Sequence, residues 1–103
     1  MSMNTYNEHK IAELFLALGQ PNRIRILNLL RQDPVLCACE MQNKLNLEQS
    51  NLSRHLSTLA DAGVLIRWKD GVRTNYKIAD PLILDLLDKA EKTLHQDDLQ
   101  STG

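Results

Sequence analysis

The sequence lacks the features that mark membrane, secreted and cofactor-dependent proteins. It has no apolar run approaching the roughly 18 residues of a membrane span, and its N-terminus has neither the basic start nor the apolar core of a secretory signal. Its 103 residues include only four glycines and two cysteines, so neither a glycine-rich cofactor loop nor a disulfide framework is expected. We therefore expect a cytoplasmic protein that contacts no membrane and uses no organic cofactor.

The net charge is close to zero, but the charges are unevenly distributed. A formal net charge of −1 argues neither for nor against a nucleic-acid partner. Residues 64–78 carry a local balance of +3, whereas residues 79–103 carry −4. Because a basic segment attracts phosphate groups whatever the overall charge of the chain, we expect residues 64–78 to face nucleic acid.

Apolar periodicity predicts five helices and one β-hairpin. The signals are apolar residues at helical spacing, helix-ending residues such as Gly19 and Gly63, and an Asp-Gly turn between two β-branched stretches. The expected helices span residues 8–18, 22–31, 35–45, 48–62 and 81–95, and the expected strands span residues 64–68 and 72–78. Residues 35–37 could also be extended. This order matches a mainly α winged helix-turn-helix domain over residues 8–95, with flexible tails at residues 1–7 and 96–103.

The same spacing predicts which side chains are buried and how the third and fourth helices are joined. Asn46 is expected to make the turn between them, because asparagine tolerates the left-handed backbone conformation. The expected buried residues are Ile24, Leu27 and Leu30 or Leu29 in the second helix, Met41 and Leu45 in the third, and Leu52, Leu56 and Leu59 in the fourth. Trp68 and Tyr76 are expected to be packing residues on the strands rather than stacking platforms.

The polar side of the fourth helix carries side chains suited to reading DNA. Amides, hydroxyls and a guanidinium bond to base edges in the major groove or fix phosphates. A recognition helix enters the groove by its N-terminal end, so residues early in this helix are the favoured contacts. The candidates are Gln49, Ser50, Asn51, Ser53 and Arg54, with Ser57 and His55 farther along the helix.

The hairpin adds two candidate contacts, Lys69 and Arg73. They are placed to touch backbone phosphate or the minor groove, which adds affinity without sequence information. An ordinary solvated helix face is the alternative for the fourth helix. Three coincident features favour double-stranded DNA as the partner: a polar face with few acids, a short preceding helix at helix-turn-helix spacing, and a basic hairpin directly after it.

Several of these stretches resemble the ArsR/SmtB family of metal-responsive repressors. The stretch from Leu47 to Leu56, the Ala62-Gly63-Val64-Leu65 segment and the wing end Tyr76-Lys77-Ile78 are similar to the family's DNA-binding region. Leu18 to Leu27 resembles its second-helix signature, so the resemblance covers about residues 8 to 90. It implies a homodimeric repressor whose first and last helices form the dimer interface and whose two recognition helices meet a palindromic operator.

Cys37 and Cys39 form a candidate soft-ion site. Thiolates select thiophilic ions, and trivalent arsenic or antimony takes up to three sulfur ligands. Residues two apart point to the same side of an extended segment but about 200° apart on a helix. Both sulfurs therefore reach one ion only where the helix start is extended or unwound. The pair resembles the Cys-x-Cys signature of the family's arsenic, antimony, cadmium and lead sensors, which implies that the bound ion releases the operator and derepresses resistance genes.

Departures from the family's patterns narrow the choice of ion. Gln42 stands where the arsenic sensors have a third cysteine, so a small thiol, solvent or a group elsewhere in the dimer would supply the third ligand. Residues 1–36 contain none of the cysteines that complete the family's cadmium and lead site, which favours arsenite or antimonite. Asp85 is followed two residues later by Leu87 rather than by histidine, so no zinc, cobalt or nickel site is expected on the last helix.

Other interpretations of the chain stay open on sequence alone. The cysteines could sense oxidation instead of an ion, or be buried apolar residues. A winged module used purely for protein contact would show no salt-dependent DNA affinity. A small thiol-dependent enzyme is disfavoured, because Glu40 is the only acid–base group adjacent to the thiols. We therefore expect no enzymatic activity.

Overall fold

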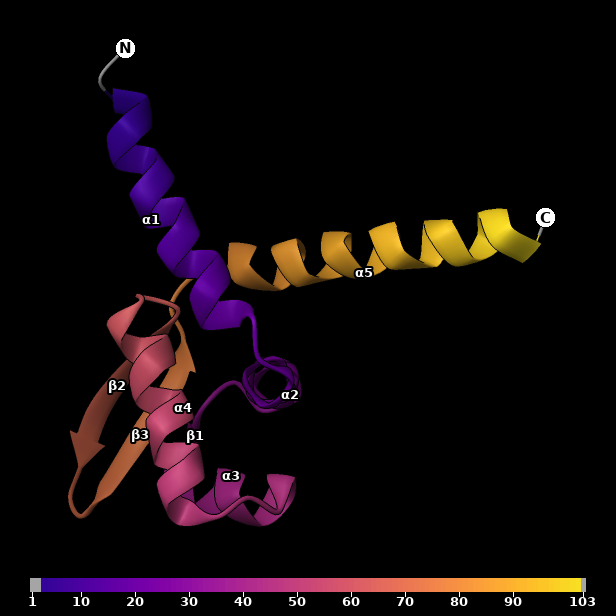
Figure 1. The fold of residues 1–103 in the computed structure, drawn as a ribbon. Coiled ribbons are helices and arrows are strands. Elements are labelled where there is room, and N and C mark those ends of the chain that lie inside the picture. The colour runs from indigo at the N-terminus through magenta and orange to yellow at the C-terminus, as the bar shows by residue number, and fades with distance from the viewer. Residues whose placement is uncertain (1–2, 103) are drawn as a thin grey trace.

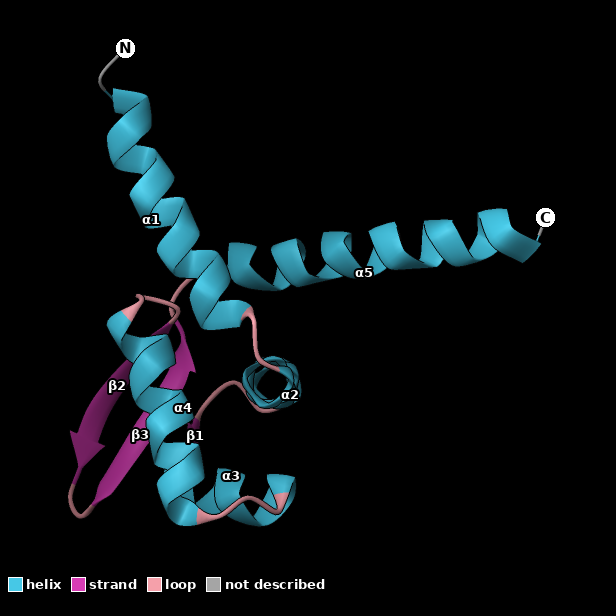
Figure 2. Ribbon diagram, in the orientation of Figure 1, coloured by secondary structure: helices cyan, strands magenta, loops and turns pink. Residues whose placement is uncertain are grey.

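The computed structural model describes residues 3–102, and the side chains of residues 7–95. The helices are α1 (Met3–Leu18), α2 (Pro21–Gln32), α3 (Ala38–Leu45), α4 (Gln49–Asp61) and α5 (Leu82–Thr102), and the strands are β1 (Leu36–Cys37), β2 (Leu65–Asp70) and β3 (Arg73–Ile78). α4 lies beside the β2–β3 hairpin, whereas α1 and α5 project from this body in different directions (Figure 1). The arrangement confirms the predicted winged helix-turn-helix fold (Figure 2).

β1 settles how the chain runs ahead of α3. Leu36 and Cys37 are extended and pair antiparallel with β3, giving a sheet with the order β1-β3-β2. Of the two conformations that the sequence allowed for residues 35–37, the extended one is therefore present at residues 36 and 37. Its ladder with β3 gives these backbone groups hydrogen-bond partners that a longer α3 would otherwise have supplied.

The hairpin turn lies one residue later than predicted. Asp70 pairs with Arg73, so Gly71 and Val72 form the turn, and the predicted turn at residues 69–71 is wrong. Gly71 has a φ of 66°. A positive φ at the first of two turn residues is typical of a type II′ turn, whose twist matches that of the flanking strands.

Two arginines of α2 hold the C-terminal ends of neighbouring helices. Arg23 Nη1 donates to the carbonyl oxygens of Leu16 and Ala17 in α1, at 3.3 and 3.2 Å. Arg25 Nη2 donates to the carbonyl oxygen of Leu45, the last residue of α3, at 3.0 Å. Because the final carbonyls of a helix lack intrahelical partners and carry partial negative charge, these bonds fix both helix ends against α2.

The core confirms most of the predicted buried residues and corrects one helix face. Met41, Leu45, Leu52, Leu56 and Leu59 are buried as predicted, and so are Leu27, Leu30 and Tyr76. In α2, however, Ile26 is fully buried whereas Ile24 is 36% exposed. α2 carries apolar residues on several sides, so periodicity alone does not fix the buried face. Ile24 instead lines a shallow cleft against α5.

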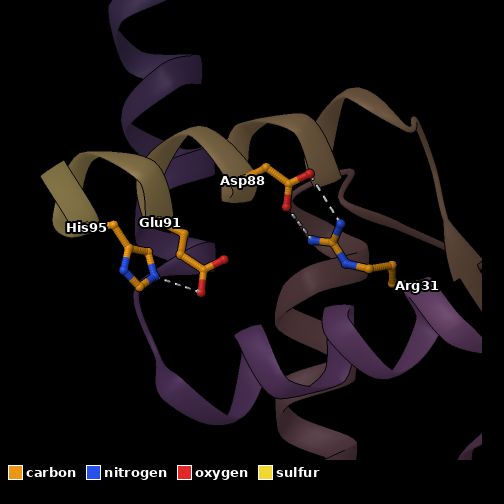
Figure 3. A network of polar contacts seen from close by, with 4 residues as sticks. All are labelled: Arg31, Asp88, Glu91 and His95. Atoms are coloured by element: carbon orange, nitrogen blue, oxygen red, sulfur yellow. Dashed lines mark hydrogen bonds and ion pairs between the residues drawn. The ribbon is translucent and has the colours of Figure 1, made fainter.

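An ion pair ties α5 to the body of the domain. Arg31 of α2 meets Asp88 of α5 through two contacts of 3.0 and 3.3 Å, and His95 lies 3.8 Å from Glu91 one turn along α5 (Figure 3). Both partners of the Arg31–Asp88 pair are well exposed, so we expect it to orient α5 while adding at most about 1 kcal/mol of stability.

The outer helices are longer than the sequence predicted. α1 begins at Met3 rather than at residue 8, and α5 runs to Thr102 rather than ending near residue 95. No glycine or proline lies in either extension, so nothing in the sequence stops the helix there. The flexibility of residues 1–7 and 96–103 stays a prediction, and residues 1, 2 and 103 lie outside the described residues.

Within residues 3–102, no helix has the length and apolar character to cross a membrane.

Candidate nucleic-acid interface

A tight turn connects α3 and α4. α3 ends at Leu45 and α4 begins at Gln49. Asn46 has φ and ψ of 55° and 49°, and its N–H donates to the carbonyl oxygen of Gln42. The predicted left-handed conformation of Asn46 is thus confirmed. This conformation reverses the chain within a few residues, so that α4 crosses α3 with its polar side outward.

The candidate base-reading side chains gather on the first half of α4. Gln49, Ser50, Ser53 and Arg54 are exposed, and Asn51 is half-buried. Arg54 Nη2 donates to Asn51 Oδ1 at 3.0 Å, which orders the two side chains relative to each other. The structure therefore places all five on one accessible surface, while their contacts with DNA stay a prediction.

His55 occupies a place that the sequence did not reveal. It is only 7% exposed, and its Nδ1 accepts a hydrogen bond from Arg23 Nε at 3.1 Å. Burial, followed by the charges of Arg23 and Arg54, lowers the pKa of His55 below its usual value, which favours the neutral imidazole. Its position three residues after Leu52, within the leucine stripe, was the available signal. His55 therefore positions α4 against α2 rather than facing DNA.

The cationic side chains of the wing lie both beside its turn and next to α4. Lys69 and Arg73 are exposed on either side of the turn, and Val72 at the tip is fully exposed. Ser57 of α4 is half-buried and accepts a hydrogen bond from Arg67 Nη1 of β2 at 3.5 Å. Arg67, which was not among the sequence candidates, thus lies between the recognition helix and the wing.

The two wing aromatics differ in their packing. Tyr76 is buried, as predicted for a packing residue. Trp68 is 37% exposed, and the Nζ of Lys77 lies 5.9 Å from the centroid of its ring. This distance permits a weak cation–π contact, so the prediction that Trp68 is a packing residue is only partly met.

The cysteine pair lies at the junction of β1 and α3. Cys37 is the residue that caps the N-terminus of α3, with an extended backbone, and its sulfur accepts a hydrogen bond from the backbone N–H of Glu40. Glu40 Oε1 in turn accepts from the N–H of Cys37 at 3.0 Å. Cys37 is buried and Cys39 is exposed. The extended backbone thus reaches Cys37 only, because Ala38 and Cys39 belong to the first turn of α3. Binding of one ion by both sulfurs stays a prediction.

The two thiols are near enough for Cys39 to affect the ionisation of Cys37. Burial, followed by the hydrogen bond with the Cys39 thiol, raises the pKa of Cys37, whereas the hydrogen bonds from Cys37 lower the pKa of Glu40. Two adjacent thiols fit a thiophilic ion that needs two protein sulfurs. Among the described side chains, no group of three or more His, Cys, Asp or Glu residues gathers around a common point, so any third ligand would come from outside that set.

A cleft of about 410 Å³ joins the cysteine pair to the DNA-facing elements. Its lining includes Cys37, Cys39, Gln42, Gln49, Ser53 and Arg73. The cysteines, the start of α4 and the wing thus share one opening. Gln42 lies in the same cleft, so the position of the family's third cysteine faces this space but carries an amide.

Known proteins are similar to this chain in both sequence and fold. The chain is 35% identical over 78 residues to an uncharacterized HTH-type transcriptional regulator of Methanocaldococcus jannaschii, an alignment that covers 76% of this chain and 88% of that protein. It is 33% identical over 67 residues to the arsenical resistance operon repressor of Escherichia coli, covering 65% of this chain and 57% of that protein.

The structural comparison agrees with the sequence relatives. The crystal structure of Mycobacterium tuberculosis Rv0081 superposes with a TM-score of 0.78 at 39% identity, covering 89% of this chain and 92% of that one. The family model for bacterial regulatory proteins of the arsR family matches residues 20–67, which include α2, α3, α4 and the start of the wing. Proteins of this kind bind DNA and regulate transcription and are not enzymes. The chain belongs to the arsR family of bacterial regulatory proteins.

Proposed function

We propose that the protein is a homodimeric repressor that releases its operator when trivalent arsenic or antimony binds Cys37 and Cys39. The observation that carries this proposal is the shared cleft, which opens the thiol pair toward Gln49 and Ser53 of α4 and Arg73 of the wing. The similarity to the arsenical resistance repressor of Escherichia coli supports the choice of ion.

The chemistry of the ion suits two thiols and an open cleft. Arsenous acid reacts with the thiols of Cys37 and Cys39 to form two arsenic–sulfur bonds and release two molecules of water, with no change in oxidation state. The third position on arsenic keeps its hydroxide or takes a small thiol from solution. Gln42 leaves that position without a protein sulfur, so the open cleft is where the exogenous third ligand would lie.

The N-terminal cap of α3 provides a route from ion to DNA. The Cys37 sulfur accepts the Glu40 N–H in the free protein, and an arsenic–sulfur bond engages the same sulfur. A weakened cap loosens the first turn of α3, which runs through the Asn46 turn into α4. An ion that favours the loosened form weakens operator binding, and by linkage DNA weakens ion binding by the same factor.

The outer helices supply the surface for a second copy. Ile11 and Phe15 are four residues apart on α1 and are 51% and 55% exposed, and Leu82 and Leu94 on α5 are each 66% exposed. Large exposed apolar side chains gathered on two projecting helices favour association. Two copies would present two recognition helices to a palindromic operator.

Fluorescence anisotropy with the protein's own promoter DNA tests the proposal. We expect salt-sensitive binding by the reduced protein, and arsenite or antimonite to weaken it about 5- to 150-fold, the usual range of such coupling. Zinc, which the thiol pair alone would not hold, should have little effect, and cadmium should act more weakly than arsenite.

The Cys37→Ser/Cys39→Ser variant is the matched control. It should bind the operator as the wild type does and ignore arsenite. An equal loss of DNA binding on adding arsenite to the variant and the wild type would show that the sensor lies elsewhere. Absence of operator binding at low salt would overturn the repressor proposal itself.

A redox response is the second candidate, because two free cysteines lie one residue apart at the start of α3. Hydrogen peroxide would oxidise the pair to a disulfide and be reduced to two molecules of water. The same titration with peroxide separates the candidates, since release by peroxide without release by arsenite would favour oxidation. The raised pKa of Cys37 weighs against this candidate, because the thiolate is the form that attacks peroxide.

A further inference from the structure

The two faces of the wing hairpin carry different cations. Arg67 and Lys69 lie two residues apart in β2 and therefore on the same face. Lys77 of β3 pairs with Ile66 and so lies on the opposite face, next to Trp68. A pair of positive charges thus faces one side of the hairpin, and a third cation of the same hairpin faces the other.

The face with Arg67 and Lys69 borders a cleft of about 500 Å³ between α4 and the hairpin. α4 runs alongside the hairpin, on the part of the molecule away from the projecting end of α5 (Figure 1). The cleft is lined by Ser53, Ser57, Arg67, Trp68, Lys69, Thr74 and Tyr76. Among the described residues that line it, none is a carboxylate. Two cationic residues and four hydroxyl-bearing residues therefore line one space.

Contacts with α4 hold Arg67 at the edge of this cleft. Its Nη1 donates to Ser57 Oγ at 3.5 Å, and its Nη2 lies 3.9 Å from the Asp61 carboxylate. The Arg67 side chain is still 45% exposed. A guanidinium has five N–H donors in a planar fork, so donors stay available to an anion in the cleft.

We propose that this cleft seats a backbone phosphate of the operator, bound by Arg67 and Lys69 with hydroxyl donors from α4. Phosphate oxygens accept hydrogen bonds from guanidinium, ammonium and hydroxyl groups alike. A phosphate between α4 and the wing fixes how deeply the recognition helix enters the major groove. The inference rests on the DNA binding of the proposed function and adds Arg67, a residue that sequence reasoning left out.

The salt dependence of DNA affinity tests this inference. Operator and scrambled duplexes of equal length are titrated by anisotropy over a range of KCl concentrations with the wild type and the Arg67→Gln, Lys69→Gln and Lys77→Gln variants. We expect Arg67→Gln and Lys69→Gln to reduce the slope of log K against log [KCl] by about 0.9 each and to weaken both duplexes roughly fivefold near physiological salt. Lys77→Gln removes the same charge from the opposite face and should leave the slope almost unchanged.

Other outcomes overturn the proposal. An unchanged slope in Arg67→Gln, or an equal reduction in Lys77→Gln, would show that the cleft holds no phosphate. A loss confined to the operator duplex would indicate a base contact instead. Urea unfolding of each variant controls for the fold, and Lys69→Gln leaves the Arg67–Ser57 hydrogen bond in place. If the phosphate proposal fails, the wild type still binds its operator and still responds to arsenite. If the proposed function fails, the wild type lacks operator binding or the arsenite response.

Discussion

At the scale of single residues, the side chains that position α4 differ from those that face DNA. His55 lies on the recognition helix but is buried, and it accepts a hydrogen bond from Arg23, which also holds the last carbonyls of α1. Arg23 of α2 thus contacts α1 through these carbonyls and α4 through the neutral imidazole of His55. The sequence placed polar residues on α4 correctly but did not separate this buried one, because its partner is 32 residues away.

His55 makes stability depend on pH. Its folded-state pKa is lowered, so below the ordinary histidine pKa of about 6.5 the unfolded chain binds more protons than the folded one. Stability is therefore retained above that value and falls as the pH drops through it, until the lower folded-state pKa is passed. Urea unfolding at mildly acidic and neutral pH should show this loss.

The His55→Gln variant is the control for this pH effect. Its amide oxygen can still accept the Arg23 N–H, but it does not titrate, so the variant should lose less stability on acidification. His9 and His95 are exposed and present in both proteins, which makes their contribution a shared background. Equal acid losses in the two proteins would contradict the assignment to His55.

At the scale of secondary-structure elements, the sequence predicted the features that depend on residues close together in the chain. The leucine stripe of α4, the Asn46 turn and the presence of the hairpin follow from spacing and turn chemistry within about fifteen residues, although the turn of the hairpin lies one residue later than predicted. The buried face of α2 and the strand β1 depend on distant partners, since β1 exists through its pairing with β3. The cleft between the cysteines and α4 was not predictable either, because segments far apart in the chain form it.

The Asn46 turn sets the direction in which α4 follows α3, and substitutions at this residue test that role. Asn46→Val places a β-branched residue at a φ of 55°, so we expect it to lower the free energy of unfolding by about 1–2 kcal/mol and to weaken operator binding. Asn46→Gly should be tolerated, because glycine adopts this conformation without strain.

A valine substitution elsewhere in α3 separates backbone strain from a general effect. Asn43 is exposed within the helix, so Asn43→Val should cost only a few tenths of a kcal/mol through helix propensity. Urea unfolding measures all three variants. A similar cost for valine at both positions would show that the left-handed conformation is not what makes Asn46 sensitive.

At the scale of the whole molecule, the projecting helices α1 and α5 leave large apolar side chains of the monomer exposed. The chain extends 50 by 43 by 22 Å, a broad and thin shape in which α1 and α5 extend beyond the body that contains the cleft and the recognition helix (Figure 1). A domain of about 100 residues buries only about two-thirds of the surface that its unfolded chain exposes, so covering the apolar residues of both helices with a second copy would stabilise the fold. This geometry keeps the proposed dimer surface apart from the wing.

Phe15→Glu tests whether the association of two copies and DNA binding are linked. A charge at this exposed apolar position enters a two-fold interface twice, so we expect the dimer dissociation constant to rise by at least about two orders of magnitude, as measured by sedimentation equilibrium. Ile66→Glu, at a 43% exposed apolar residue of the wing, should leave the dimer intact. Because a monomer contacts one half-site, Phe15→Glu should also lose most of its affinity for a palindromic operator while keeping similar affinity for an isolated half-site. A Phe15→Glu protein that stays dimeric would place the interface on another surface.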